Sequence, residues 1–165
     1  KVPSEININH LIQKVLDILN PSLNSSNIEV IKNIDDFEFV TIENDLIQIL
    51  MNIITNAKDA LIDLKDEEAR YIFINISKNQ KNIVIEIFDN AMGIKDEIIS
   101  RVFEPYFTTK HKSQGTGIGL YMSKILVDNN LKGNIAVENH TFIYNNKEFK
   151  GAKFIILLPI KLEKK

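Results

Sequence analysis

The stretch Gly115-Thr116-Gly117-Ile118-Gly119-Leu120 places three glycines at alternate positions, just where a helical pattern begins. Glycine tolerates φ > 0 and lets a ligand approach the main chain closely. The start of a helix adds unpaired N–H groups and the positive end of the helix dipole. The stretch therefore predicts an anion site, most simply for a nucleotide phosphate, although glycine-rich turns also precede helices for steric reasons alone.

The residues around the three glycines argue against two common phosphate-binding loops. The glycines are not followed by Gly-Lys-Ser/Thr, so this is not a Walker-type loop. They also do not follow a strand near the N-terminus with an acidic residue downstream, which argues against a dinucleotide-binding turn. What the glycines hold has to be decided by the rest of the chain.

The composition is that of a soluble globular protein. A chain of 165 residues with 44% hydrophobic and 25% charged residues is enough for one domain with a core. The net charge of −2 offers no basic field for nucleic acid. Because the chain has no cysteine, disulfides, thiol catalysis and cysteine metal sites are excluded.

The N-terminal part predicts a helix followed by two short strands. Ser4 can cap a helix whose apolar stripe runs from Ile8 to Leu19, and Pro21 ends it. Residues 28–31 and 37–42 read as strands around a polar turn.

A second, stronger helical pattern begins at Asp45, which has capping-box spacing to Gln48, and runs to Leu64. Two alternating runs, 71–77 and 82–89, then predict a hairpin of central strands.

The C-terminal half predicts a short helix at 95–102, an irregular segment at 103–115 and a helix that opens at Thr116. Three further alternating runs complete a sheet, at residues 134–138, 141–144 and 152–159. This order of elements predicts an α+β fold, with helices layered on one mostly antiparallel sheet. An irregular segment of this length inside a compact domain is usually either functional or disordered.

Polar side chains form a strip on the long helix, since Gln48, Asn52, Asn56 and Asp59 lie three or four residues apart. A solvated face would explain the strip. However, asparagine is a mediocre helix former, and Asn56 directly precedes Ala57 of the apolar stripe. A carboxamide oxygen there would suit Mg²⁺, which takes one or two protein oxygens together with phosphate oxygens.

Two further stretches allow both a structural and a functional interpretation. Asp89 ends a strand before Asn90-Ala91-Met92-Gly93-Ile94, either as part of a turn or as an acceptor for a donor such as an adenine amino group. The aromatic residues between Val102 and Lys110 either plug the core or face a partner, and Lys110 could lie near phosphates.

Together these motifs resemble the catalytic ATP-binding domain of bacterial sensor histidine kinases. Four sequence boxes of that family are matched in order: Asn52-x-x-x-Asn56-Ala57-x-x-Ala60, Asp89-x-x-x-Gly93, Phe103-Glu104-Pro105-Tyr106-Phe107-Thr108-Thr109-Lys110 and Gly115-x-Gly117-x-Gly119-Leu120. The stretches Gly133-Asn134-Ile135 and Gly151-Ala152-Lys153-Phe154 match as well. Each box is weak alone, but their joint occurrence covers nearly the whole chain.

The resemblance implies a two-layer α/β sandwich of the Bergerat type, shared with the gyrase, Hsp90 and MutL ATPases. Residues 1–24 would be a helical linker from an upstream dimerisation and histidine domain, packed on the core. Residues 25–165 would form the catalytic domain, with a mobile ATP lid at about 95–115. Since the chain begins at Lys1 rather than Met, we expect it to be part of a longer protein.

By position in the boxes, the resemblance assigns the ligands ATP and Mg²⁺. Asn56 would bind Mg²⁺, Asn52 would lie beside the phosphates, and Asp89 would accept from the adenine amino group. Asn52, Asn56 and Lys110 would be the catalytic residues. The other expected ATP contacts are Asp59, Gly93, Ile94, Lys110, Gly115, Thr116, Gly117, Ile118, Gly119 and Leu120. Phe103 and Phe107 would dock the domain onto the histidine-bearing helices.

The implied activity is transfer of the ATP γ-phosphoryl group to a histidine on a separate dimerisation domain, in two-component signalling. The related ATPases place a glutamate four residues before the Mg²⁺-binding asparagine, whereas Asn52 cannot take a proton at neutral pH. The alternatives are an ATPase of the same superfamily and a degenerate nucleotide- or partner-binding module.

The resemblance also implies the setting of the domain. We expect a cytoplasmic domain, monomeric when isolated, of a homodimeric parent that could be anchored in the inner membrane. Its partners would be the dimerisation domain and a downstream response regulator, with no nucleic acid and no direct membrane contact.

Two features depart from the family pattern. Ala91 stands where the second box usually has its first glycine, and alanine would cost about 1 kcal/mol if that position needs φ > 0. Nothing around His10 resembles the family's histidine box, and His111 and His140 read as lid and loop residues. We therefore expect the phospho-accepting histidine upstream of Lys1.

Overall fold

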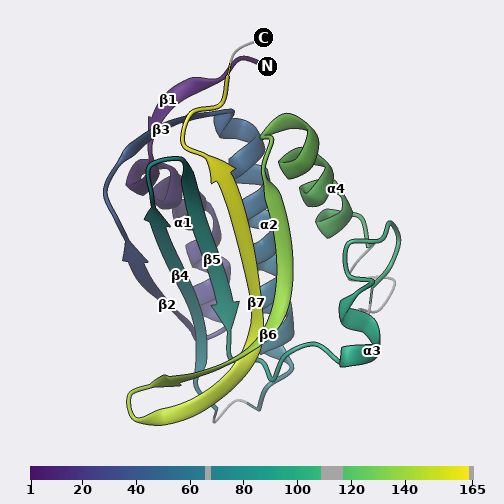
Figure 1. Ribbon diagram of the computed structural model, residues 1–165. Helices are drawn as coiled ribbons and strands as arrows, with labels where there is room; N and C mark the ends of the chain where they lie inside the picture. Colours follow the sequence, from purple (N-terminus) through teal and green to yellow (C-terminus); the bar gives the residue numbers. More distant parts are fainter. Residues whose placement is uncertain (66–67, 109–116, 164–165) are drawn as a thin grey trace.

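The computed structural model describes residues 1–65, 68–108 and 117–163. In two layers, helices α1 (Ile8–Ser25) and α2 (Glu43–Ile62) cover the rear face of a five-stranded sheet (Figure 1). The strands of this sheet are β2 (Ile28–Ile34), β4 (Arg70–Lys78), β5 (Asn82–Asp89), β6 (Asn134–Tyr144) and β7 (Lys147–Pro159). The predicted α+β sandwich is confirmed.

The strand order of the sheet is β2-β4-β5-β7-β6, with β2 and β4 parallel and every other neighbouring pair antiparallel. The predicted hairpin of central strands is β4–β5. The break predicted near residue 140 does not exist, because β6 pairs with β7 without interruption through Asn139 opposite Ala152 and His140 opposite Gly151.

The start of the chain differs from the prediction. Ser4–Asn7 form strand β1, which pairs antiparallel with β3 (Glu38–Thr41) in a second, two-stranded sheet. Helix α1 therefore begins at Ile8, and its cap is Asn7, whose side chain accepts from the N–H of His10 at 3.1 Å. Pro21 lies inside α1 and does not end it. Ser4 cannot cap the helix because its backbone belongs to a strand.

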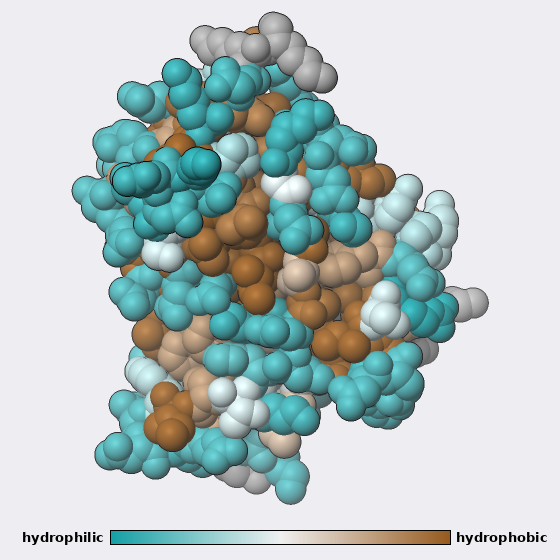
Figure 2. Space-filling view, viewed as in Figure 1, coloured by the Kyte–Doolittle hydropathy of each residue, from teal (hydrophilic) through white to brown (hydrophobic). Residues whose placement is uncertain are grey.

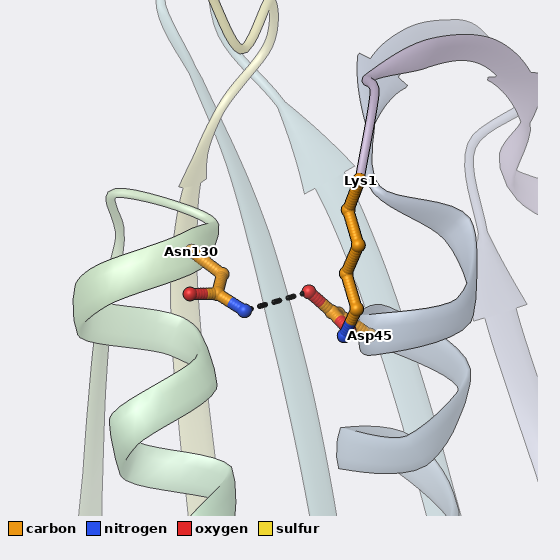
Figure 3. A network of polar contacts seen from close by, with 3 residues as sticks. All are labelled: Lys1, Asp45 and Asn130. Atoms are coloured by element: carbon orange, nitrogen blue, oxygen red, sulfur yellow. Dashed lines mark hydrogen bonds and ion pairs between the residues drawn. The ribbon is translucent and has the colours of Figure 1, made fainter.

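The capping box predicted at Asp45 is also wrong. Helix α2 begins two residues earlier, at Glu43, and Asp45 is 1% exposed. Its carboxylate accepts from the Lys1 ammonium and, at 3.0 Å, from the Asn130 amide (Figure 3). Asn130 ends a π-helical turn, η1 (Leu126–Asn130). A buried carboxylate needs such partners, so Asp45 joins the chain start, α2 and η1.

The main core lies between the helices and the sheet. Alternate strand residues such as Ile74 and Ile85 point toward the helices and are fully buried, as are Leu50 and Ile53 of α2. Among the described residues, no helix combines the length and apolar character that a membrane span needs.

The opposite face of the sheet carries a second apolar layer. Seen from the side of Figure 1, hydrophobic residues occupy the middle of this face within a hydrophilic surround (Figure 2). Toward its lower end the β6–β7 hairpin bends, and Phe142 near its tip packs edge-on against Phe73 and Phe88, with ring centroids 5.1 and 5.0 Å apart. The hairpin thereby covers the ends of β4 and β5.

Candidate nucleotide-binding site

A cavity of about 1370 Å³ lies between α2, the end of β5, the segment from Ala91 to Thr108, and helix α4 (Gly119–Ile125). Pockets that bind small molecules usually occupy several hundred Å³, so this cavity is large enough to hold a nucleotide. Nine predicted contacts line it: Asn52, Asn56, Asp59, Asp89, Gly93, Ile94, Gly117, Gly119 and Leu120. Phe107 and Thr108 of the third box line it as well, so all four boxes converge on a single space although they are far apart in sequence.

Asp89 is the buried carboxyl group of this cavity. It ends β5, is 3% exposed, and its Oδ1 accepts from the N–H of Ala91 at 2.9 Å and of Ala152 at 3.4 Å. Burial raises the pKa of Asp89 to about 6, against the opposing effect of these two hydrogen bonds. At neutral pH the group is a carboxylate with one oxygen fixed by the backbone, suited to accept from an amino group.

The turn after β5 shows whether alanine at position 91 is strained, as it would be if this position needed a positive φ. Ala91 is not among the residues with positive φ; the left-handed positions are Met92, at φ 73°, and Gly93, at φ 86°. Alanine at position 91 therefore carries no strain of this kind, and the conformational cost falls on Met92, a non-glycine residue. The N–H of Met92 donates to the Lys150 carbonyl at 2.9 Å.

Three of the four residues in the polar strip of α2, Asn52, Asn56 and Asp59, line the cavity, whereas Gln48 does not. The Asn52 amide donates to the Gly119 carbonyl and to the Ser123 hydroxyl, both at 3.2 Å. Because Ser123 is fully buried in α4, these bonds fix the Asn52 carboxamide between the two helices.

The glycine-rich box is described from Gly117 onward, and Lys110, Gly115 and Thr116 lie outside the described residues. Gly117 has φ 74°, and its carbonyl accepts from the N–H of Tyr106 at 3.0 Å. A Cβ at position 117 would lie 2.5 Å from the Tyr106 carbonyl carbon, so only glycine fits. Helix α4 begins at Gly119 rather than at Thr116. Ile118 caps it and does not line the cavity.

The aromatic run divides into three environments. Phe103 packs edge-on against Phe154, with ring centroids 6.2 Å apart. Phe107 lines the cavity, and the Arg101 guanidinium lies 4.6 Å from its ring centroid. Tyr106 between them is 78% exposed. The run thus contains a core contact, a cavity wall and an exposed ring.

Two contributors to the site were not predicted. The first is Gly151 of β7. A Cβ at this position would lie 1.7 Å from the Asp89 carbonyl oxygen, so the absence of a side chain lets the backbones of β7 and β5 approach each other closely. A glycine inside a strand pattern is the sequence signal for such an approach. The second contributor is Asn139 of β6, whose carboxamide forms hydrogen bonds with the backbone of Ile94. The two residues are 45 positions apart, and no sequence pattern indicates that they are in contact.

Comparison with known proteins agrees with this geometry. The chain is 31% identical over 160 residues to Sporulation kinase E of Bacillus subtilis, covering 95% of this chain and 20% of that protein. It is 28% identical over 162 residues to the sensor histidine kinase ZraS of Escherichia coli, covering 97% of this chain and 32% of that protein. The chain therefore spans a fifth to a third of the length of these relatives.

Among solved structures, the catalytic domain of the histidine kinase ThkA superposes with a TM-score of 0.80 at 26% identity, covering 98% of this chain and 97% of that one. Residues 41–162 match the family described as "Histidine kinase-, DNA gyrase B-, and HSP90-like ATPase". They contain α2, the sheet from β4 to β7 and the whole cavity. The chain belongs to this family, with the fold of a histidine kinase catalytic domain.

Proposed function

We propose that this chain binds Mg·ATP in the cavity and transfers the γ-phosphoryl group to a histidine on the dimerisation domain of the same kinase. The observation that supports this most directly is the composition of the cavity wall: a buried carboxyl group at Asp89 and amides at Asn52 and Asn56. The names of the relatives, a sporulation kinase and a sensor histidine kinase, support the same class of reaction.

Asp89 would recognise the base. Its Oδ1 accepts hydrogen bonds from the backbone N–H groups of Ala91 and Ala152. The ionised carboxyl group can accept further hydrogen bonds, including one from an adenine amino group. Gly93 and Ile94 would form the floor beside the purine, and Leu120 of α4 would flank the nucleotide with Gly117 and Gly119.

The opposite end would hold the phosphates and the metal. Asn56 would offer a hard carboxamide oxygen to Mg²⁺, and Asp59 lies on the same wall of the cavity. Mg²⁺, when bound, supplies positive charge that offsets the charge of the phosphates. Lys110 would contribute a second positive charge.

Asn52 would keep the site from activating water. An amide cannot act as a general base at neutral pH, and this one is held by Gly119 and Ser123. The domain would therefore position ATP for in-line attack by a protein nucleophile rather than hydrolyse it.

The partner surface and the domain limits complete the proposal. The half-buried Phe103 and Phe107, with the exposed Tyr106 between them, would help dock the domain onto the histidine-bearing helices. Residues 1–24 would connect the domain to those helices. A response regulator would receive the phosphoryl group in turn.

The test combines the purified chain, labelled ATP with Mg²⁺, and a purified fragment of the same kinase that carries the dimerisation helices and their histidine. We expect label on that histidine, and none after Asn56→Ala or Asp89→Ala. Stoichiometric ATP binding without label on the fragment would indicate a degenerate binding module. Rapid phosphate release by the chain alone would indicate an ATPase.

A further inference from the structure

We propose that Asn139 is a positioning residue of the nucleotide site, which sets base recognition by holding the turn after β5 in place. This inference rests on the proposed function. Asn139 itself does not line the cavity. It acts through Ile94 and Gly93, which do.

The turn needs external support. Met92 and Gly93 are consecutive residues in the left-handed region, at φ 73° and 86°, and Met92 is 64% exposed. A non-glycine residue in this region costs about 1 kcal/mol or more, and such conformations persist where the surrounding structure determines them. The exposed Met92 side chain packs too little to provide this support.

The support comes from the β6–β7 hairpin. One contact is the Met92 N–H to the Lys150 carbonyl. The other is the Asn139 carboxamide, whose Oδ1 accepts from the N–H of Ile94 at 2.8 Å and whose Nδ2 donates to the carbonyl of Ile94 at 2.7 Å. One side chain thus satisfies both backbone groups of a single residue, as a neighbouring strand would.

This geometry requires a carboxamide of the right length. A carboxamide has a donor and an acceptor in one plane, like a peptide group, whereas a carboxylate has acceptors only and a hydroxyl group is too short to reach both atoms. The fit is close, since a Cβ at Gly93 would lie 2.6 Å from the Asn139 Oδ1. Glycine at position 93 therefore suits both the positive φ and the proximity of the Asn139 carboxamide.

The consequence for the ligand follows from where the turn lies. Asp89, at one end of the turn, would accept from the adenine amino group, and Ile94, at the other end, forms the adjoining wall. Release of Ile94 would move this wall relative to Asp89, whose carboxyl group remains fixed by Ala91 and Ala152. Base recognition would weaken, while the phosphate end on α2 would be unaffected.

The experiment measures the affinities for Mg·ATP, Mg·ITP and Mg·tripolyphosphate by calorimetry, in the unmodified chain, Asn139→Ala and Asn139→Asp. ITP carries an oxo group in place of the adenine amino group. We expect about tenfold weaker ATP binding in Asn139→Ala, from the loss of two hydrogen bonds. The preference for ATP over ITP should shrink, and tripolyphosphate binding should stay constant. Asn139→Asp should bind ATP more weakly still, because its carboxylate would face the Ile94 carbonyl.

Asn134→Ala is the matched control, since Asn134 is an exposed asparagine on the same strand. Asn139→Ser serves if the alanine variant does not fold. An unchanged ATP-to-ITP ratio in the variants, with or without lower thermal stability, would overturn the inference, since a purely structural role leaves that ratio alone. Failure of the unmodified chain to bind Mg·ATP would instead refute the proposed function.

Discussion

Replacing Asp89 by asparagine should stabilise the protein without nucleotide while abolishing its function. The carboxyl group is 3% exposed, and burial raises its pKa from 3.8 to about 6. One pKa unit corresponds to about 1.4 kcal/mol, so ionisation of the buried group costs the folded protein about 3 kcal/mol relative to the unfolded chain. Asparagine keeps the shape of the side chain and its Oδ1, which can still accept from Ala91 and Ala152.

The sign of the pH dependence follows from the raised pKa. The favourable contribution of protonated Asp89 is complete below pH 3.8 and is lost as the pH rises through about 6. The Asp89→Asn variant has no such loss. Its advantage in unfolding free energy should therefore be near zero at pH 4, grow up to about pH 6, and reach about 3 kcal/mol at pH 8.

Urea unfolding of both proteins without nucleotide, at intervals between pH 4 and pH 8, measures this difference. Asp63→Asn, at the exposed C-terminal end of α2, controls for the change in net charge. Calorimetry should show that Asp89→Asn loses ATP binding, because its amide would present N–H groups to the adenine amino group. A stability difference independent of pH, or a less stable variant at pH 8, would refute the reasoning.

Three further predictions concern the same site. Asn56→Ala should remove the Mg²⁺ dependence of ATP binding, measured by titration with and without Mg²⁺. Met92→Gly should raise the unfolding free energy by about 0.5–1 kcal/mol, because glycine adopts φ 73° without strain; equal or lower stability in urea would contradict this. Gly151→Ala should disrupt the end of β5, since its Cβ would lie 1.7 Å from the Asp89 carbonyl oxygen, and we expect loss of both ATP binding and several degrees of thermal stability.

The sequence predicted those parts of the fold whose signals are local. The apolar repeat of α2 and the alternation of β4 and β5 each depend on neighbouring residues, and all three elements form, with α2 shifted toward the N-terminus by two residues. The boxes containing Asn56 and Asp89 are equally local, and the fold brings them to one cavity.

The wrong predictions at Ser4 and Asp45, and the missed role of Asn139, concern residues whose partners are distant in the chain. Ser4 looks like a helix cap until its pairing with Thr41 is known. Asp45 has the spacing of a capping box, but its carboxylate is bound by Lys1 and Asn130, which lie 44 and 85 residues away. Asn139 carries no local signal at all. In each case a tertiary contact determines the role of a polar side chain.

The order of the strands has a consequence for folding. The two local hairpins, β4–β5 and β6–β7, are joined into one sheet where β5 pairs with β7, and this seam places Ala152 against Asp89. Either hairpin alone therefore contains half of the cavity wall around Asp89, and the complete cavity exists only after the slower, non-local docking step. A bound nucleotide would then stabilise the whole sheet against global unfolding rather than one part of it, by an amount that grows with the logarithm of its concentration.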